Sequence, residues 1–505
     1  MSAWRVAGIR FISLLGRLKM CLKFPPPVWG IFLLEIGLFS RKFLRVSLFL
    51  LVLVLAVTPV ARAQQTVPEG PVYVVQPGDS LWGIAALFGI SVDELAAANG
   101  ISDPGLLTVG ARLVIPGLEG IEGVLTAVDV PLGANLASLS ARYDVPQDWL
   151  VRLNRITNPQ QLAAGQPLLI PFQEGEDAPA PGGKVVVHAG ESLLEVALRN
   201  GLSPWELLQQ NNLSTPHQVL AGDVLRGGPA ELADETAFPP QVALSLNTTA
   251  PVQGRTLEVR LDVPSGTTVS GSFTDRPLNF FPLPDGGMVA LQGIYALQEP
   301  GVYPFSLEGT LPDGTPLRFE QGLVVRSGDY PYDPPLTVAS QTTNIENNEA
   351  ENARWAEIVA PVTPERYWEG RFQSPMPEYL SDCFPSQFGN RRSYNQSGYL
   401  FFHTGLDFCG QTGVEIYAPA RGKVVFTGEL VVRGNATVID HGWGVYSAYA
   451  HQSEILVQEG EWVEAGQLIG RVGSTGRVTG PHLHWEIIVG GVQVDPLQWL
   501  AETFP

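Results

Sequence analysis

The histidines of this sequence gather near its C-terminal end. Five of the seven follow position 400, in a β-rich region punctuated by glycine: His403, His441, His451, His482 and His484. Neutral imidazole binds divalent metal ions and also moves protons near neutral pH. The clustering therefore predicts metal or acid–base chemistry, provided that strand ends and turns bring these positions together.

Spacing within this region indicates what chemistry to expect. In "HTGLD", His403 and Asp407 lie four positions apart, and His482 and His484 lie two apart in "TGPHLHWEI". In an extended chain each of these pairs shares one face. A zinc hydrolase needs three His or carboxylate ligands, an open position for water and a nearby acid–base group. A His2Asp site with His484 as third ligand fits, but spacing alone does not decide between His482 and His484. The remaining imidazole, or that of His451, would handle the proton.

The motifs "HTGLD", "YAHQ" and "STGRVTGPHLHWEI", preceded by "FGNRR", resemble the lysostaphin-type, or LytM-like, zinc metallopeptidases, which cut peptide bonds in peptidoglycan. The resemblance covers roughly residues 384–497 and implies a mainly antiparallel β peptidase domain at 380–500. It implies that Zn2+ is held by His403, Asp407 and His484, and that His451 and His482 are catalytic, assisting proton transfer and oxyanion stabilisation.

Other residues of this domain carry weaker expectations. Arg391 follows Phe-Gly where the family often has an arginine, so it is a candidate substrate-binding residue. His441 is expected to be structural, because the resembling family uses this turn to place a strand; direct contact with substrate is the alternative. Trp443 and Trp485 are expected to pack, as aromatic residues beside a β-core usually do, and lining the substrate groove is the alternative. The loop between Arg391 and the first zinc ligand is longer than the minimal family pattern, which leaves the shape of the substrate site open.

Two cysteines, Cys383 and Cys409, remain once the N-terminal segment containing Cys21 is set aside. In an exported protein such a pair could form a disulfide, and only one pairing is then available. The sequence does not show the geometry that the bond requires.

Three repeats precede the histidine-rich region, at residues 71–117, 123–172 and 183–229. A Leu and an Asn recur 18 positions apart in each repeat, and a Gly follows 11 positions later. These residues are Leu81, Asn99 and Gly110; Leu136, Asn154 and Gly165; and Leu193, Asn211 and Gly222. Short β-branched runs and cap-like Ser or Asn predict a β-α-α-β unit. The units resemble LysM modules, which implies binding to the glycan of peptidoglycan or chitin. The first unit matches best, and packing units without a ligand are the alternative.

Residues 238–328 change to short alternating runs separated by Pro, Gly and Asp-Gly turns, which predict an all-β immunoglobulin-like sandwich. Asn, Glu and Thr then dominate a polar stretch, and we expect a linker with a short helix at 335–375. The sequence as a whole predicts a multidomain chain of LysM modules, sandwich and peptidase domain.

The N-terminal residues 1–63 are typical of an export signal. Basic residues precede the apolar run "VSLFLLVLVLAV", and "ARA" follows as a cleavage-type site. An uncleaved membrane anchor is the alternative, and an early start codon would explain the unusual length. We therefore expect export across the cytoplasmic membrane, to the cell envelope or outside the cell.

Composition restricts the partners. The chain has 505 residues and a formal net charge of -19, which argues against nucleic acid because phosphate binding needs a basic surface. The expected partner is peptidoglycan, with LysM on the glycan and the peptidase domain on the peptide. The leading hypothesis is a tethered zinc endopeptidase. The alternatives are a non-catalytic adaptor that activates another hydrolase, which would lack a ligand or catalytic histidine, and a glycan-binding scaffold.

Overall fold

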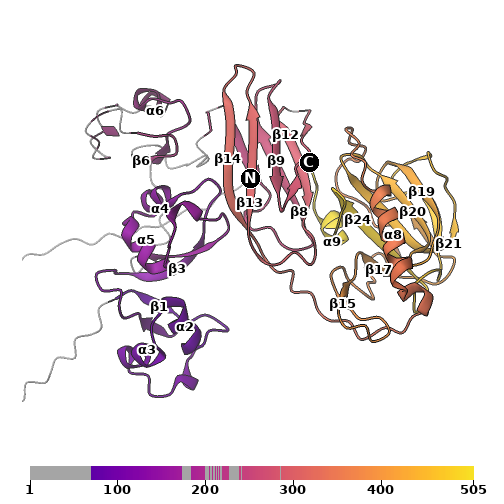
Figure 1. The fold of residues 1–505 in the computed structure, drawn as a ribbon, viewed down its shortest axis with the longest axis horizontal. Coiled ribbons are helices and arrows are strands. Elements are labelled where there is room, and N and C mark those ends of the chain that lie inside the picture. The colour runs from indigo at the N-terminus through magenta and orange to yellow at the C-terminus, as the bar shows by residue number, and fades with distance from the viewer. Residues whose placement is uncertain are drawn as a thin grey trace, which may run out of the picture. The chain divides into compact units, whose positions relative to one another are not determined.

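The computed structural model describes residues 70–172, 184–199, 238–239, 241–284 and 286–505, with shorter stretches between 204 and 226 (Figure 1). The predicted export segment, residues 1–63, lies outside the described residues, as does most of the second predicted helix of the third repeat. Among the described helices, no single one is long and apolar enough to cross a membrane. Helices α2 (Leu81–Phe88) and α3 (Val92–Asn99) reach that length and apolarity only when they are counted together across a bend of 107°.

The first two repeats fold as the predicted β-α-α-β units. The elements of the first are β1 (Val72–Val74), α2 (Leu81–Phe88), α3 (Val92–Asn99) and β2 (Arg112–Val114). Those of the second are β3 (Val124–Asp129), α4 (Leu136–Tyr143), α5 (Gln147–Asn154) and β4 (Pro167–Phe172). In the third, the described elements are β5 (Lys184–Val186), α6 (Leu193–Arg199) and β6 (Val224–Arg226).

In the first two units, the repeated Asn links the second helix to the closing strand. Nδ2 of Asn99 donates to the carbonyls of Leu95 and Val114, and its Oδ1 accepts from the Val114 N–H at 2.7 Å. Asn154 makes the same pair of bonds to the backbone of Leu169. Buried backbone groups need such partners. The fixed spacing between Leu and Asn therefore reflects a shared hydrogen-bonding role as well as packing.

Residues 243–325 form two antiparallel four-stranded sheets around one buried apolar core. One sheet has the order β10-β9-β13-β14 and the other β11-β12-β8-β7. The strands are β7 (Ala243–Leu246), β8 (Thr256–Asp262), β9 (Thr268–Phe273), β10 (Arg276–Pro277), β11 (Phe281–Pro282), β12 (Met288–Gly293), β13 (Gly301–Thr310) and β14 (Pro316–Val325). The immunoglobulin-like type of this sandwich stays a prediction.

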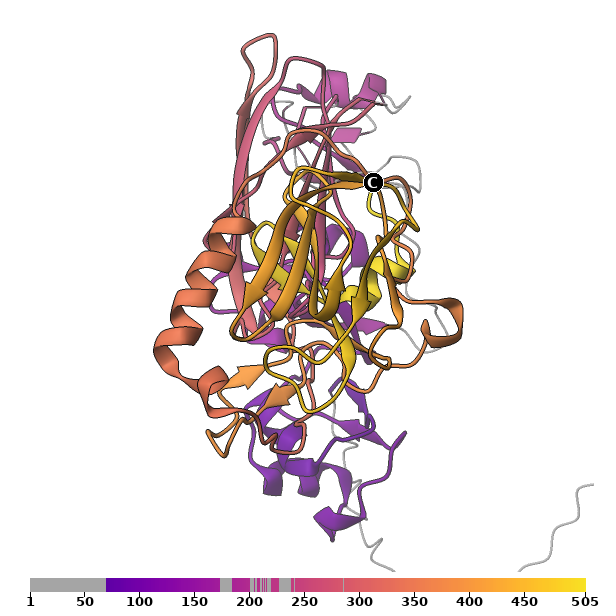
Figure 2. The same ribbon diagram turned by 90° about the vertical axis from the view of Figure 1, so that its right-hand side faces the viewer.

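The segment predicted as a linker contains the turn η4 (Ser340–Thr343) and helix α8 (Ile345–Ile358). Asn344 caps the helix by accepting from the N–H of Asn347. Trp355 on α8 is buried in a cluster with Phe426 and Tyr446 of the C-terminal sheet. Figures 1 and 2 show α8 beside that sheet. This part of the polar segment is therefore packed on the domain that follows it.

The C-terminal domain is built on a nine-stranded, antiparallel sheet with the main order β17-β24-β21-β20-β19-β22. A separate hairpin, β15 (Arg391–Arg392) and β16 (Phe401–Phe402), precedes it. The sheet consists of β17 (Leu406–Cys409), β18 (Glu415–Tyr417), β19 (Gly422–Leu430), β20 (Gly434–Asp440), β21 (Val445–Ile455), β22 (Trp462–Val463), β23 (Leu468–Val472), β24 (His482–Val489) and β25 (Val492–Val494). The turn η5 (Glu378–Leu380) precedes the hairpin, and helix α9 (Pro496–Ala501) follows the last strand. The five clustered histidines all lie in this domain.

Candidate active site

The three predicted zinc ligands converge on one point. His403 Nε2, Asp407 Oδ1 and His484 Nδ1 lie 2.9 Å from one another, and all three side chains are buried. Tetrahedral zinc with bonds of about 2.0–2.1 Å would hold such atoms slightly further apart, so a small outward movement would admit the ion. These residues form the candidate metal site among the described residues.

Strand register explains the convergence. Asp407 on β17 lies directly opposite His484 on the antiparallel strand β24. His403 precedes β17 in a close crossing, where a Cβ on Gly405 would lie 2.3 Å from the Trp485 carbonyl oxygen and 3.0 Å from the His484 ring. The glycine of "HTGLD" is therefore needed for this close approach.

Partners outside the site orient each ligand toward the shared point. Nδ1–H of His403 donates to the Gln387 carbonyl at 2.8 Å, which leaves its Nε2 lone pair facing inward. Nε2–H of His484 donates to Glu486 at 3.1 Å, and Arg392 donates to the other oxygen of Asp407 at 3.0 Å. Such outer bonds are usual for metal ligands. The donor set and its tautomers therefore fit zinc.

Two further imidazoles face the same site from outside the group of three converging atoms. His451 donates from Nδ1 to the Thr475 carbonyl at 2.7 Å, and His482 donates from Nδ1 to the Gly480 carbonyl at 2.9 Å. Both Nε2 atoms are thereby left as acceptors. The two rings are 4.9 Å apart, and His482 Nε2 lies 3.6 Å from Asp407 Oδ1. This arrangement provides two bases beside a metal site.

A β-bulge places His451. Along β20 and β21 the register passes from Thr437 opposite Tyr449 to Asn435 opposite Gln452, so β21 holds one residue more than its partner there. His451 has a φ of 62°, which L-residues rarely adopt. Bulges of this kind redirect a side chain near an active site. The alternation of an ideal strand would not predict this orientation.

Burial sets the protonation states. It lowers the pKa of His403 to about 4 and lowers the pKa of His451 well below its ordinary value, with the charges of His482 and His484 adding to the second effect. Burial would raise the pKa of Asp407, but its interactions with His403 and His484 hold that pKa well below the ordinary value. Burial lowers the pKa of His484, but its hydrogen bonds with Asp407 and Glu486 outweigh that effect and raise the pKa above its ordinary value. The site therefore combines an ionised carboxylate with His403 and His451 held neutral, and a metal ion would displace the proton that His484 carries.

Glu486 supports the third ligand and is also buried. Burial alone would raise its pKa, but Arg433 and the hydrogen bond from His484 lower the pKa to about 2. We expect Glu486→Gln to lower zinc affinity by about 10-fold and Glu486→Ala by up to about 100-fold, since loss of an outer partner weakens the ligand it orients. Competition with a chelating dye measures the Kd for zinc. An unchanged Kd in both variants would contradict this role.

Arg391, the predicted substrate-binding residue, shares strand β15 with Arg392. Nη2 of Arg391 donates to the Tyr399 carbonyl at 2.9 Å, whereas Nη2 of Arg392 reaches Asp407. Neighbouring side chains on a strand point to opposite faces, and the sequence does not indicate which face is inward. The structure thus brings Arg392 to the site, and the substrate role of Arg391 stays a prediction.

The sequence analysis also did not identify Glu486. A signal was available, because side chains alternate along a strand and Glu486 lies two positions after His484, on the same face of β24. Thr404 Oγ1 donates to Glu486 at 2.7 Å, and Arg433 lies 3.7 Å from it. Arg433 in turn contacts Glu351 of α8 at 3.0 Å. No local sequence signal indicates this last contact, because 82 positions separate the two residues.

His441 lies apart from these residues and is fully buried. Its Nδ1–H donates to the Arg421 carbonyl at 2.9 Å, and its Nε2 accepts from Ser447 at 2.7 Å. Burial lowers its pKa to about 4. Trp443 and Trp485 are buried in the core of the same domain, with Trp443 6% and Trp485 0% exposed.

The low pKa of His441 predicts a loss of stability in acid. In the unfolded chain the imidazole of His441 binds a proton below about pH 6.5, whereas in the native protein it binds one only near pH 4. The free energy of unfolding therefore falls as the pH drops from the first value to the second. We expect His441→Gln to flatten this fall by roughly 3 kcal/mol in total. Urea unfolding followed by tryptophan fluorescence at several pH values measures it. Parallel curves for variant and wild type would contradict the prediction.

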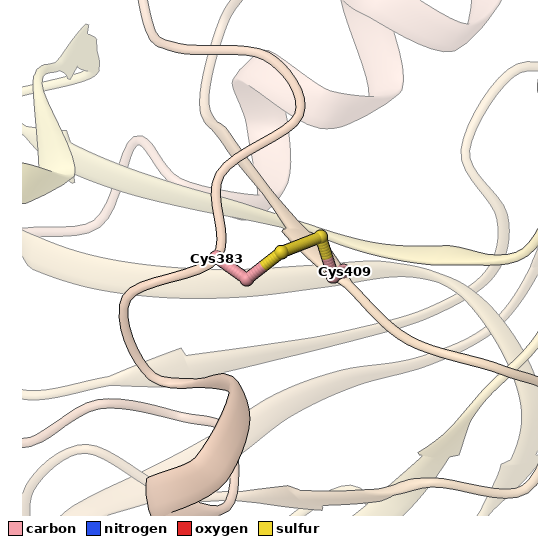
Figure 3. Close-up of a disulfide and its surroundings, with 2 residues drawn as sticks. All are labelled: Cys383 and Cys409. Atoms are coloured by element: carbon pink, nitrogen blue, oxygen red, sulfur yellow. A yellow bond between two sulfur atoms is a disulfide. The ribbon is translucent and has the colours of Figure 1, made fainter.

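A disulfide joins Cys383 to Cys409 (Figure 3). Cys409 ends the strand that carries Asp407, and the backbone N–H of Cys409 donates to the Cys383 carbonyl at 3.0 Å. The segment after Cys383 contains Ser386, whose carbonyl accepts from the N–H of Asp407 and whose hydroxyl lies 3.3 Å from His403. The cross-link therefore holds together two segments that contact the metal ligands.

Comparison with known proteins agrees with this geometry. The family model described as peptidase family M23 matches residues 401–496, and the LysM domain model matches residues 73–116, 133–171 and 185–226. Peptidoglycan DD-endopeptidase ShyA of Vibrio cholerae is 42% identical over 113 residues, which cover 22% of this chain and 26% of the relative. This chain therefore spans about a quarter of the length of that relative.

Two other matches cover more of the chain. Murein hydrolase activator NlpD of Salmonella typhimurium is 26% identical over 322 residues, which cover 64% of this chain and 69% of the relative. A crystal structure of a putative peptidase M23 from Pseudomonas aeruginosa is 27% identical, with a TM-score of 0.37, and the match covers 50% of this chain and 96% of that one. The chain therefore contains three LysM domains followed by a domain of peptidase family M23.

Proposed function

We propose that this protein is a zinc endopeptidase that hydrolyses peptide bonds in peptidoglycan. The observation that carries the proposal is the convergence of three ligand atoms, from His403, Asp407 and His484, beside the free Nε2 atoms of His451 and His482. A scaffold that only binds glycan has no use for two additional bases at a metal site.

The residues divide the work of hydrolysis as follows. When bound, zinc would supply a Lewis acid that lowers the pKa of water and polarises a carbonyl group. Nε2 of one of the two free imidazoles accepts the proton of the attacking water and later returns it to the leaving amine. The other imidazole takes up a proton from solvent on Nε2 and donates this N–H to the oxyanion, and it returns the proton to solvent after product release. The carbonyls of Thr475 and Gly480 hold both rings in the tautomer that this work needs.

The LysM repeats would keep the enzyme on its polymer substrate. In the first repeat, Trp82 is 73% exposed, and an exposed aromatic ring suits the apolar face of a sugar. Tethering raises the local concentration of peptide at the catalytic domain. We further propose that the protein is exported and works in the cell envelope. The Cys383–Cys409 disulfide supports this location, because such bonds persist in oxidising compartments.

A second candidate function is activation of another peptidoglycan hydrolase without cleavage. The similarity to murein hydrolase activator NlpD, over about two thirds of this chain, favours it. The complete set of ligands and bases in this chain favours the enzyme.

Incubation of the purified protein with isolated peptidoglycan separates the two functions. The enzyme is expected to bind one zinc ion per chain and to release soluble peptides with new amine termini, and a chelator should stop the release. Bound zinc without release from several peptidoglycan types would contradict the proposal and favour the activator.

A further inference from the structure

Two cavities open on the candidate active site and share one wall. The first, of about 260 Å³, is lined by His403 and His484, and the second, of about 370 Å³, is lined by Asp407 and His482. The residues that line both are Arg392, Tyr394, His451 and Arg477. A peptide lying across the site would contact this shared wall.

Arginines lie around these cavities although the chain as a whole is acidic. Two of them are neutralised by carboxylates of the protein. Arg392 lies 3.0 Å from Asp407 and 3.4 Å from Asp333. Arg433 lies 3.0 Å from Glu351 and 3.7 Å from Glu486. These two arginines are therefore committed to holding the site together.

Arg477 is different, because it forms no ion pair with any residue that the structure describes. Its Nη1 donates to the Thr342 carbonyl at 3.3 Å and to Asn348 Oδ1 at 3.2 Å, and its guanidinium lies 4.2 Å from the centre of the Tyr394 ring. These contacts fix the plane of the group. Nε and Nη2 of Arg477 make no hydrogen bond within the described part of the chain, so the N–H groups on this edge of the guanidinium remain available to a ligand.

The surroundings of Arg477 favour an anion. Its side chain is half-buried, and burial lowers its pKa; Arg433 and Arg392 lower the pKa further despite their own ion pairs, while Tyr394 and Glu351 oppose this effect without outweighing it. An incoming carboxylate would relieve this unfavourable environment. An arginine that presents two parallel N–H groups matches the geometry of a carboxylate.

We propose that Arg477 binds a carboxylate of the substrate and so makes the site selective for peptides that carry a free carboxylate near the scissile bond. The inference rests on the proposed function and narrows its substrate class. A purely structural role, in which Arg477 only fastens the segment of Thr342 and Asn348 to the domain, predicts no dependence on the charge of the substrate.

The test compares a cross-linked muropeptide dimer with the same dimer after its carboxylates have been converted to amides. For the wild type, we expect the KM for the acid dimer to be about 10- to 100-fold lower than the KM for the amide dimer, because the amide cannot form the charge-assisted hydrogen bond with Arg477. Arg477→Gln should raise the KM for the acid alone and so abolish the preference, with zinc content and kcat unchanged. Arg477→Lys keeps the positive charge but lacks the two parallel N–H groups of the guanidinium, so this variant should retain part of the preference for the acid dimer. Arg421→Gln, an exposed arginine paired with Glu464 in the same domain, is the matched control.

Two results would overturn the inference. One is a wild-type KM that is the same for the acid dimer and the amide dimer. The other is an Arg477→Gln substitution that raises the KM for both dimers by the same factor. Equilibrium binding of the two dimers to zinc-loaded His482→Ala, with and without Arg477→Gln, gives a second readout that needs no cleavage. If the wild type cleaves neither dimer but binds the acid through Arg477, the proposed hydrolysis fails while this inference stands.

Discussion

Replacing His482 with alanine is expected to leave one zinc ion per chain and to lower the rate of peptidoglycan cleavage by about 10²- to 10⁴-fold, as loss of a general acid–base group does. The reason is the position of its ring. Nε2 faces the metal site as an acceptor but lies 3.6 Å from Asp407, outside the group of three converging ligand atoms. Metal analysis and release of new amine termini measure the two quantities.

The neighbouring pair His482 and His484 provides an internal control. His484→Ala should lose zinc as well as activity, because Nδ1 of His484 is one of the three converging atoms. If His482→Ala loses zinc to the same extent, or retains full activity, the assignment of the two histidines is incorrect.

The His403→Ala variant is expected to lose both zinc and cleavage, with zinc affinity falling by more than about 100-fold, beyond the cost of losing an outer partner. Only two ligand atoms would remain, one of them the carboxylate that Arg392 also contacts. A dye competition assay gives the Kd, and circular dichroism checks that the fold is kept.

His441→Gln is the matched control for this result, because it also removes a completely buried imidazole from the same domain. That variant should keep zinc and cleavage at neutral pH. Full zinc binding in His403→Ala would refute the proposed ligand set, and zinc loss in His441→Gln would show that the metal site responds to any disturbance of the core.

Much of this architecture could be predicted from local patterns. The repeat spacing predicted the β-α-α-β units, because each Leu and Asn occupies one fixed place in a small unit. The shared face of His403 and Asp407 was predictable from their spacing, whereas the choice of His484 over His482 as third candidate ligand came from the family resemblance, because both histidines of that pair share one face. In each case the informative residues are close in sequence, or belong to a motif whose family is recognisable.

The remaining features depend on contacts that no local pattern records. The choice between Arg391 and Arg392 depends on the pairing of a two-residue strand. The orientation of His451 depends on a bulge that appears only when β20 and β21 are paired. The contact between Glu351 and Arg433 joins a polar segment, predicted as a linker, to a residue of the site wall.

The left-handed backbone at His451 has a consequence for how such a domain can change over generations. A side chain other than glycine held at positive φ costs about 1–3 kcal/mol, which the surrounding structure must offset. A mutation to glycine at this position would relieve that strain while removing a base. If the proposed cleavage depends on His451, selection for cleavage would oppose relief of the backbone strain at this single residue. In a descendant that keeps the domain only for binding, glycine at this position would relieve the backbone strain without that opposition, although the hydrogen bond from the ring to the Thr475 carbonyl would be lost.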